Sequence, residues 1–193
     1  MVGDRDPAGS PGLYLVATPI GNAGDISQRA LDLLARADIV ACEDTRVTAK
    51  LFAIHGIKAP LVAYHEHNAE RMRPLLIERL KNGETVALVS DAGTPLISDP
   101  GYKLVRDVVA AALPVTALPG ASAVLTALVL SGLPTNRFLF AGFLPAKQVA
   151  RRRELTELVS LKASLVFLES KQRLARTLAD MADVLGPRPA AVA

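Results

Sequence analysis

Short runs of apolar and β-branched residues recur along the first two-thirds of the chain, and each run ends at a polar, turn-forming cluster. The runs are Leu13–Ala17, Ile39–Cys42, Leu61–Tyr64, Val86–Val89 and Val115–Leu118. Between them lie stretches with the apolar spacing of helices, such as Ile26–Arg36, Met72–Leu80 and Pro100–Ala112. Strands that alternate with helices predict a parallel β-sheet with helical crossovers.

A second series of elements follows a loop at residues 132–136. Its pattern predicts strands at Phe138–Phe140 and Ser164–Leu168, helices at Val149–Leu161 and Gln172–Leu185, and the start of a third strand at Ala190–Ala193. We therefore expect a two-domain α/β protein, with a mostly parallel sheet in an N-terminal domain at residues 13–133 and a second α/β domain at residues 136–193. Because that second stretch is short for a core and stops within a strand, we expect it to be incomplete at its C-terminus. The polar residues 1–12 predict a disordered lead-in.

The polar clusters at the strand ends carry most of the chemistry of the N-terminal domain. They are Thr18-Pro19-Ile20-Gly21-Asn22, Glu43-Asp44-Thr45-Arg46, His65-Glu66-His67-Asn68, Ser90-Asp91-Ala92-Gly93-Thr94-Pro95 and Pro119-Gly120-Ala121-Ser122. Ligands of parallel α/β sheets bind outside the carboxyl ends of the strands. These clusters therefore predict an active or binding site at one edge of the sheet.

The cluster after the fourth strand is the most informative, because Asp91 is followed by turn residues that expose the backbone to a ligand. An ordinary strand–turn–helix junction is the alternative. The small residues around Gly120 allow a ligand to approach, or they serve helix–sheet packing. Neither G-x-G-x-x-G after the first strand nor a P-loop motif is present, so we do not expect a dinucleotide or nucleoside triphosphate.

Acids and imidazoles gather at neighbouring strand ends. Glu43, Asp44, His65 and Glu66 are candidates for acid–base catalysis or substrate contacts, and a solvated surface is the alternative. A divalent metal at His65 and His67 is a further alternative, but no metal-ligand spacing is fixed, and we expect no metal.

Composition and charge narrow the class of protein. Half of the residues are hydrophobic, and no apolar run is long enough to span a bilayer. The single cysteine, Cys42, excludes an internal disulfide and fits the cytoplasm. Residues 1–135 carry 12 Lys and Arg against 14 Asp and Glu, whereas residues 136–193 carry 10 against 5. This basic excess suits a polyanionic partner, or it is a solvated helix face.

Five motifs in this order and spacing closely resemble the ribosomal RNA small-subunit methyltransferase I family, the RNA-modifying branch of the tetrapyrrole methylases. They are Leu15–Asn22, Glu43–Arg46, Tyr64–Asn68, Ser90–Pro100 and Leu118–Ala123. The likeness continues through Phe140–Pro145, the basic run that ends at Arg153, and Phe167–Ser170. It covers nearly everything from Leu13 onward.

The resemblance implies a two-domain tetrapyrrole-methylase-like fold and a reaction. S-adenosylmethionine would donate a methyl group to the ribose 2′-oxygen of a cytidine in the decoding region of small-subunit (16S) ribosomal RNA. The cofactor would lie between the two domains of a cytoplasmic homodimer that acts on ribosomal RNA or the assembled 30S subunit, and neither a membrane nor DNA is expected as a partner.

The resemblance also implies which residues serve each role. Cofactor contacts are expected at Pro19, Asp91, Gly93, Thr94, Ser122, Ala123 and Leu168. The acidic and His-rich loops would face the RNA, with contacts expected at Arg46, His67 and Asn68. From the local density of basic residues, and not from the resemblance, we also expect RNA contacts at Lys147, Arg151, Arg152 and Arg153. The candidates for the general base or for orienting the ribose remain the four acid and imidazole side chains named above.

Three other functions stay open at this point. A tetrapyrrole-precursor methylase would share the fold, although the basic run at Arg151–Arg153 argues against it. A metal-dependent hydrolase would use His65 and His67. A truncated form that binds RNA without catalysis is the third.

Overall fold

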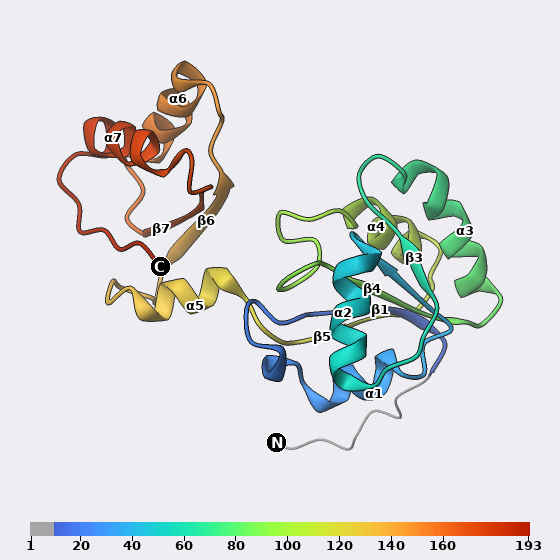
Figure 1. Ribbon diagram of the computed structural model, residues 1–193. Coiled ribbons are helices and arrows are strands. Elements are labelled where there is room, and N and C mark those ends of the chain that lie inside the picture. Colours follow the sequence, from blue (N-terminus) through green and yellow to red (C-terminus); the bar gives the residue numbers. More distant parts are fainter. Residues whose placement is uncertain (1–9) are drawn as a thin grey trace. The chain divides into compact units, whose positions relative to one another are not determined.

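The computed structural model describes residues 10–193, so residues 1–9 of the expected lead-in lie outside the described part. The chain divides into two compact units, one reaching to Ser122 and the other spanning Ala123–Ala193 (Figure 1). The division falls before helix α5 (Ala123–Leu130) rather than at the expected loop, residues 132–136. Helix α5 contacts strand β7 (Ser164–Leu168), and it therefore groups with the second unit.

The N-terminal unit is built on a five-stranded sheet in which every pair of neighbouring strands is parallel. Its strands are β1 (Gly12–Val16), β2 (Ile39–Cys42), β3 (Leu61–Ala63), β4 (Thr85–Val89) and β5 (Val115–Leu118). The order across the sheet is β3-β2-β4-β1-β5. The expected α/β fold with a parallel sheet is confirmed. Val89 pairs in register with Val16 and Cys42, so the polar clusters that follow these strands leave the sheet at one edge.

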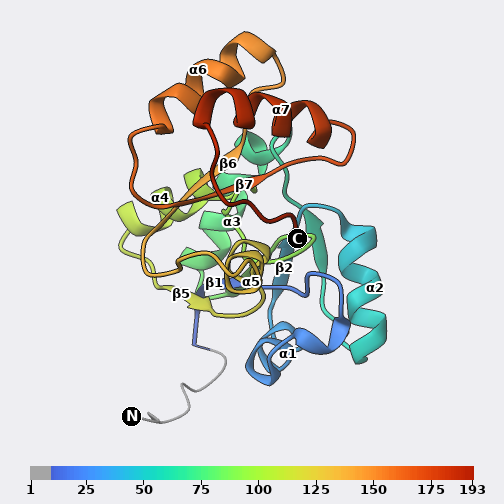
Figure 2. The same cartoon turned by 90° about the vertical axis from the view of Figure 1, so that its left-hand side faces the viewer.

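Helices cover both faces of this sheet (Figure 2). They are α1 (Gln28–Leu34), α2 (Thr45–His55), α3 (Ala69–Lys81) and α4 (Tyr102–Ala110), with a 3₁₀ turn η1 at Ala23–Asp25. Side chains alternate along each strand. Accordingly, Val89 packs in one core cluster with Phe52 of α2, whereas Leu88 packs in another with Leu76 of α3 and Leu104 of α4. A strand buried on both faces is apolar throughout, which explains the uninterrupted apolar runs of the sequence.

The second unit contains a parallel pair of strands, β6 (Phe138–Phe143) and β7, and the helices α6 (Gln148–Leu158) and α7 (Leu174–Leu185). The two helices lie side by side in Figures 1 and 2. The third strand expected at Ala190–Ala193 is not formed, because these exposed residues pair with no other strand in the described part of the chain. That expectation was wrong.

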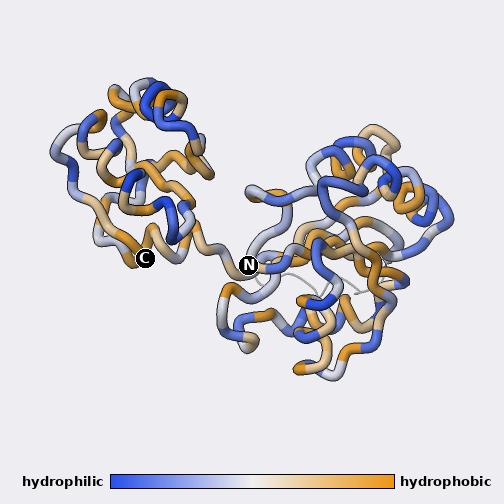
Figure 3. Tube along the Cα trace, turned by 45° about the horizontal axis from the view of Figure 1, so that its top comes forward, coloured by the Kyte–Doolittle hydropathy of each residue, from blue (hydrophilic) through white to orange (hydrophobic). Residues whose placement is uncertain are grey.

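Figure 3 shows the hydropathy of each residue along the Cα trace of the two units. Hydrophobic and hydrophilic segments alternate along the trace, and the apolar ones include the strands of the N-terminal sheet. None of the described helices is both long enough and apolar enough to cross a membrane.

Candidate functional site

The ends of β1 and β4 are tied together just beyond the sheet. The backbone N–H of Thr18 donates to the carbonyl of Gly93 at 2.9 Å, and the N–H of Gly93 donates to the carbonyl of Thr18 at 3.0 Å. The buried Thr18 hydroxyl also donates to the carbonyl of Ser90 at 3.0 Å. Gly93 has a φ of +79°, which glycine adopts without steric cost. The turn after Asp91 is therefore fixed against the end of the first strand.

A further contact ties the β4 turn to the end of β5. The Thr94 hydroxyl donates to the carbonyl of Ala121 at 3.3 Å, next to Ser122. A Cβ at Gly120 would lie 2.9 Å from the Cβ of Ala17, so glycine is required there for the two strand ends to pack. The packing role that the sequence left open for Gly120 thus has direct support.

The end of β2 joins the same edge through Asp91, whose Oδ1 accepts a hydrogen bond of 3.0 Å from the backbone N–H of Asp44. The Asp44 side chain caps helix α2 by accepting from the N–H of Arg46, and it forms an ion pair of 2.6 Å with the Arg46 guanidinium. These hydrogen bonds from Arg46 lower the pKa of Asp44 to about 2. Asp44 is therefore a weak base with a structural role.

Glu43 has a different environment from its neighbour. Burial raises the pKa of its carboxyl above the usual value, the negative charges of Asp91 and Asp99 raise it further, and His65 partly opposes them. Burial and Asp91 also raise the pKa of Asp99. The half-buried Glu43 is thus the better candidate for a general base, since a base is most effective when its pKa is near the working pH.

The His-rich loop follows β3, which lies beside β2. Asn68 holds this loop, because its Oδ1 accepts from the N–H of His65 at 2.9 Å and its Nδ2 donates to the carbonyl of Ala63 at 2.9 Å. The Asn68 amide thus has a structural role in this loop, and its expected RNA contact stays a prediction. His65 and His67 meet edge to face with ring centroids 6.0 Å apart, and Glu66 and His67 are exposed. The buried Nδ1 of His65 has no hydrogen-bond partner within residues 10–193.

Within the same described residues, no group of three or more His, Cys, Asp and Glu side chains is arranged to hold a metal ion.

The carboxyl edge of the sheet contains a cavity of about 180 Å³ between the β1 loop, the end of β4 and helix α2. Pro19 and Asp91 both line it, together with three aliphatic side chains of α2. Sequence reasoning did not single out that apolar helix face. The signal that would have found it is the helical spacing of Val47, Leu51 and Ile54 directly after the acidic cluster.

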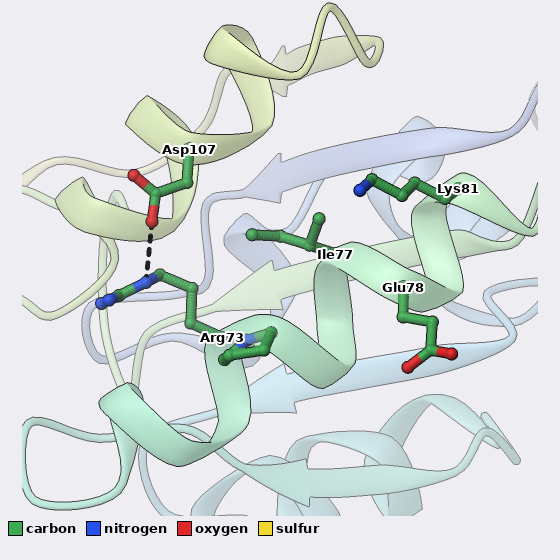
Figure 4. A pocket seen from close by; sticks show the side chains of 6 residues that line it. Arg73, Ile77, Glu78, Lys81 and Asp107 are labelled. Carbon is green, nitrogen blue, oxygen red and sulfur yellow. Dashed lines mark ion pairs between the residues drawn. The ribbon is translucent and has the colours of Figure 1, made fainter.

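A larger cavity, of about 580 Å³, lies between α3 and α4 (Figure 4). Arg73 and Lys81 lie on either side of Ile77, and the Nε of Arg73 donates to Asp107 at 2.8 Å. Two cations and two carboxylates line this cavity, Glu78 being the second carboxylate, and no residue of a strand-end cluster does so. The chemistry of the strand ends therefore favours the smaller cavity.

The expected cofactor contacts fall in both units. Pro19, Asp91, Gly93, Thr94 and Ser122 belong to the N-terminal unit and follow β1, β4 and β5, which are neighbours in the sheet. Ala123, at the start of α5, and Leu168, at the end of β7, belong to the second unit.

The basic run divides into surface and buried side chains. Lys147 and Arg153 are exposed, and Arg152 is partly exposed while paired with Asp180 and Asp183. Arg151 is only 2% exposed, its Nε and Nη2 donate to Asp180, and its Nη1 donates to two backbone carbonyls. The expected RNA contact of Arg151 is corrected, since its guanidinium is used in joining α6 to α7.

Comparison with known proteins identifies the class to which this arrangement belongs. The family described as Tetrapyrrole (Corrin/Porphyrin) Methylases matches residues 12–193, so the chain belongs to the tetrapyrrole methylases. Solved structures agree in fold. Diphthine synthase superposes with a TM-score of 0.68 at 19% identity, covering 89% of this chain and 70% of that one. Uroporphyrin-III-C-methyltransferase from Thermus thermophilus gives 0.62 at 23% identity, covering 91% and 73%.

Curated relatives narrow the comparison to one branch of that family, as the sequence motifs led us to expect. Ribosomal RNA small subunit methyltransferase I of Micromonospora olivasterospora is 55% identical over 188 residues, which cover 97% of this chain and 60% of the relative. The protein of the same name from Vibrio cholerae is 52% identical over 180 residues, covering 93% and 62%. The chain thus spans about 60% of the length of these relatives.

Proposed function

We propose that this chain forms part of an S-adenosylmethionine-dependent methyltransferase that modifies the ribose 2′-oxygen of a cytidine in the decoding region of small-subunit ribosomal RNA. The observation that carries the proposal is the hydrogen-bonded set of loops at one sheet edge, in which Thr18, Asp91 and Thr94 link four strand ends. The names of the similar curated relatives support the choice of ribosomal RNA as substrate.

The residues present fit a methyl-donor site. The turn at Gly93 and Thr94 presents backbone groups and a hydroxyl, and Asp91 offers a carboxylate that retains acceptor capacity beyond its bond to Asp44. The cavity of about 180 Å³ is smaller than the roughly 300–1,000 Å³ of typical small-molecule sites. We keep Ala123 and Leu168, at the start of α5 and the end of β7, as further proposed cofactor contacts.

S-adenosylmethionine, when bound, supplies a methyl group already activated by its sulfonium. The protein must then hold the ribose oxygen in line and exclude water, and positioning of this kind lowers a barrier by up to about 7–11 kcal/mol. Glu43 would take the proton of the ribose hydroxyl as general base, which adds about 10²–10⁴-fold in rate. His65 follows the neighbouring strand and would help to hold the nucleotide.

The partners follow from the charges and from the exposed apolar residues. Lys147, Arg152 and Arg153 of the second unit and Arg46 and His67 of the first would contact the RNA or the assembled 30S subunit. Helix α5 is apolar around its circumference, yet Leu125, Val129 and Leu130 are more than half exposed. A second copy of the chain in a cytoplasmic homodimer would cover them.

The test is transfer of a radiolabelled methyl group from S-adenosylmethionine to purified 30S subunits, with calorimetric titration of the cofactor alongside. We expect Asp91→Ala to abolish both the methyl transfer and the heat of cofactor binding. Asp91→Asn is the structural control, because its amide oxygen can still accept the hydrogen bond from the Asp44 N–H. Equal methyl transfer by the wild type and Asp91→Ala would reject the cofactor site. Transfer to a tetrapyrrole precursor instead of RNA would favour the other branch of the family.

A further inference from the structure

The cavity between α3 and α4 takes no part in the proposed reaction (Figure 4). Its volume of about 580 Å³ lies within the roughly 300–1,000 Å³ of typical small-molecule sites. Its walls come from two helices of the N-terminal unit, and none of the residues assigned above to the methyl donor or to RNA lines it. The cavity therefore has the size and the place of a second, separate binding site.

The α3 wall presents a cation at each end of an apolar stretch. Arg73, Ile77 and Lys81 are spaced i, i+4 and i+8, so they lie close to one face of the helix (Figure 4). Pro74 lines the cavity beside them. A proline inside a helix removes a backbone hydrogen bond, and here its rigid ring adds to the apolar wall. Two positive groups around an apolar floor suit a ligand that is partly apolar and negatively charged.

The carboxylates of the cavity leave these cations incompletely neutralised. Asp107 is shared, because its Oδ1 accepts from the Nε and Nη2 of Arg106 and its Oδ2 pairs with the Nε of Arg73 at 2.8 Å. Glu78 is exposed, and its carboxylate points away from Asp107 and from both cations of α3 in Figure 4. The side chains that face the cavity therefore carry a net positive charge.

The guanidinium of Arg73 is short of acceptors. Its side chain is only 19% exposed, and its buried Nη1 has no hydrogen-bond partner within residues 10–193. A buried donor without a partner is rare in folded proteins. Carboxylate and phosphate groups supply paired oxygens at the spacing of the guanidinium nitrogens, and such charge-assisted hydrogen bonds are the stronger ones. The unpartnered nitrogen thus favours an oxyanion at the Arg73 end of the cavity.

We propose that this cavity binds a small organic anion, in which a phosphate or carboxylate group is joined to an apolar ring. The oxyanion contacts Arg73, the ring packs on Pro74 and Ile77, and Lys81 supplies the second positive charge. Because the site is separate from the strand ends, this proposal does not depend on the proposed function.

The test uses the chain with ¹³C-labelled isoleucine methyl groups, because Ile77 lines the cavity and reports on its occupancy. Phenyl phosphate and benzoate are the two probes, one for each kind of oxyanion. We expect at least one of them to shift the Ile77 resonance in a saturable way, and the one that binds identifies the oxyanion. Inorganic phosphate, which lacks the ring, and benzylammonium, which reverses the charge, should each bind about tenfold more weakly or worse. No shift at Ile77, or equal binding of either comparison compound, would overturn the proposal.

Three variants separate this site from a general attraction of anions. Lys81→Met removes the second charge, and we expect it to weaken binding of that probe about tenfold. Arg73→Lys keeps the charge but loses the planar fork of the guanidinium, and it should weaken binding by at least as much. Lys103→Met, at an exposed lysine of α4 that does not line the cavity, is the matched control and should leave binding unchanged. Equal losses in Lys81→Met and Lys103→Met, or wild-type binding by Arg73→Lys, would show that the cavity is not the anion site.

A competition experiment distinguishes this site from that of the methyl donor. S-adenosylmethionine should leave the probe bound at Ile77, because none of the residues proposed to hold the cofactor lines this cavity. If S-adenosylmethionine displaces the probe, the two ligands share one site and the proposal of a separate site is rejected. Failure of methyl transfer to 30S subunits would instead reject the proposed function and leave this site standing.

Discussion

The ionised form of Glu43 is disfavoured by its position, because this carboxyl lies at the end of a buried strand and near two other acids. Because burial and the charges of Asp91 and Asp99 raise its pKa, the rate of methyl transfer should fall as the pH drops through that raised pKa, where the base becomes protonated. We expect Glu43→Gln to reduce kcat by about 10²–10⁴-fold. Asp99→Asn should move the acid limb of the kcat/KM profile to lower pH. An unchanged acid limb in Asp99→Asn would contradict this electrostatic account.

The same carboxylate should cost stability. A raised pKa means that folded Glu43 binds its proton more tightly than the unfolded chain does, so stability falls as the pH rises from its ordinary pKa of 4.5 through the folded value. Glu43→Gln should therefore raise the thermal midpoint at pH 7, and the gain should vanish at pH 4. Exposed Glu66→Gln is the control and should change the midpoint little at either pH. A lower midpoint for Glu43→Gln at pH 7 would show that the carboxylate is stabilising instead.

Sequence reasoning was least successful for the function of single polar side chains. It grouped Asp44 with Glu43 and Asn68 with His67, yet Asp44 caps α2 and Asn68 holds its own loop. A cap or loop clamp depends on backbone geometry within a few residues, and many polar residues can serve either there or at a ligand. Their types alone do not distinguish these roles.

Helices α6 and α7 are joined by a charged pair inside the second unit. Arg151 and Asp180 are each 2% exposed, and Arg151 donates to the carboxylate through two nitrogens. Burial alone would raise the pKa of Asp180, but hydrogen bonds from Gln148, Arg151 and Arg152 lower it. The stability that these bonds supply is therefore present above the ordinary pKa of 3.8 and is lost as the pH falls through the lower folded value.

Removing one member of this pair should be far worse than removing both. Arg151→Met leaves a buried carboxylate short of partners, so we expect the thermal midpoint of the second unit to fall by about 10 °C or more. The double variant Arg151→Met with Asp180→Leu should recover most of that loss. Arg153→Met, on the exposed side of the same helix, is the matched control and should have little effect. If the double variant is no more stable than Arg151→Met, the unpaired carboxylate of Asp180 is not the cause of the lost stability.

At the level of elements, the apolar runs predicted the five strands of the N-terminal sheet to within a residue at each end, because buried parallel strands read as continuous apolar runs. In the second unit, β6 extends three residues beyond the expected Phe138–Phe140, and the strand expected at Ala190–Ala193 does not form. The order β3-β2-β4-β1-β5 was not predicted, since every parallel order places the strand ends at an edge. The burial of Arg151 was missed for a related reason. Its partner, Asp180, lies on the next helix, and three consecutive arginines resemble a solvated face until that packing is known.

The molecule as a whole is divided in charge, with the basic excess in residues 136–193. The proposed RNA substrate would be repelled by an acidic N-terminal unit, so we expect the second unit to supply most of the attraction. Its exposed cations include Lys147 and Arg153, while Arg151 is unavailable. Electrostatic attraction of this kind releases counterions from the RNA and is therefore sensitive to salt.

The number of contacts between these cations and RNA phosphates can be measured from the salt dependence of RNA binding. Each phosphate contact contributes about 0.7–0.9 to the slope of log K against log salt, so Lys147→Ala and Arg153→Ala should each reduce the slope by that amount. Lys103→Ala, an exposed cation on α4, is the control and should leave the slope unchanged. Fluorescence anisotropy with a labelled RNA over a range of potassium chloride concentrations gives the slopes. If Lys103→Ala lowered the slope as much as Arg153→Ala, RNA attraction would be spread over both units, and the second unit would lose its assigned part in capturing the substrate.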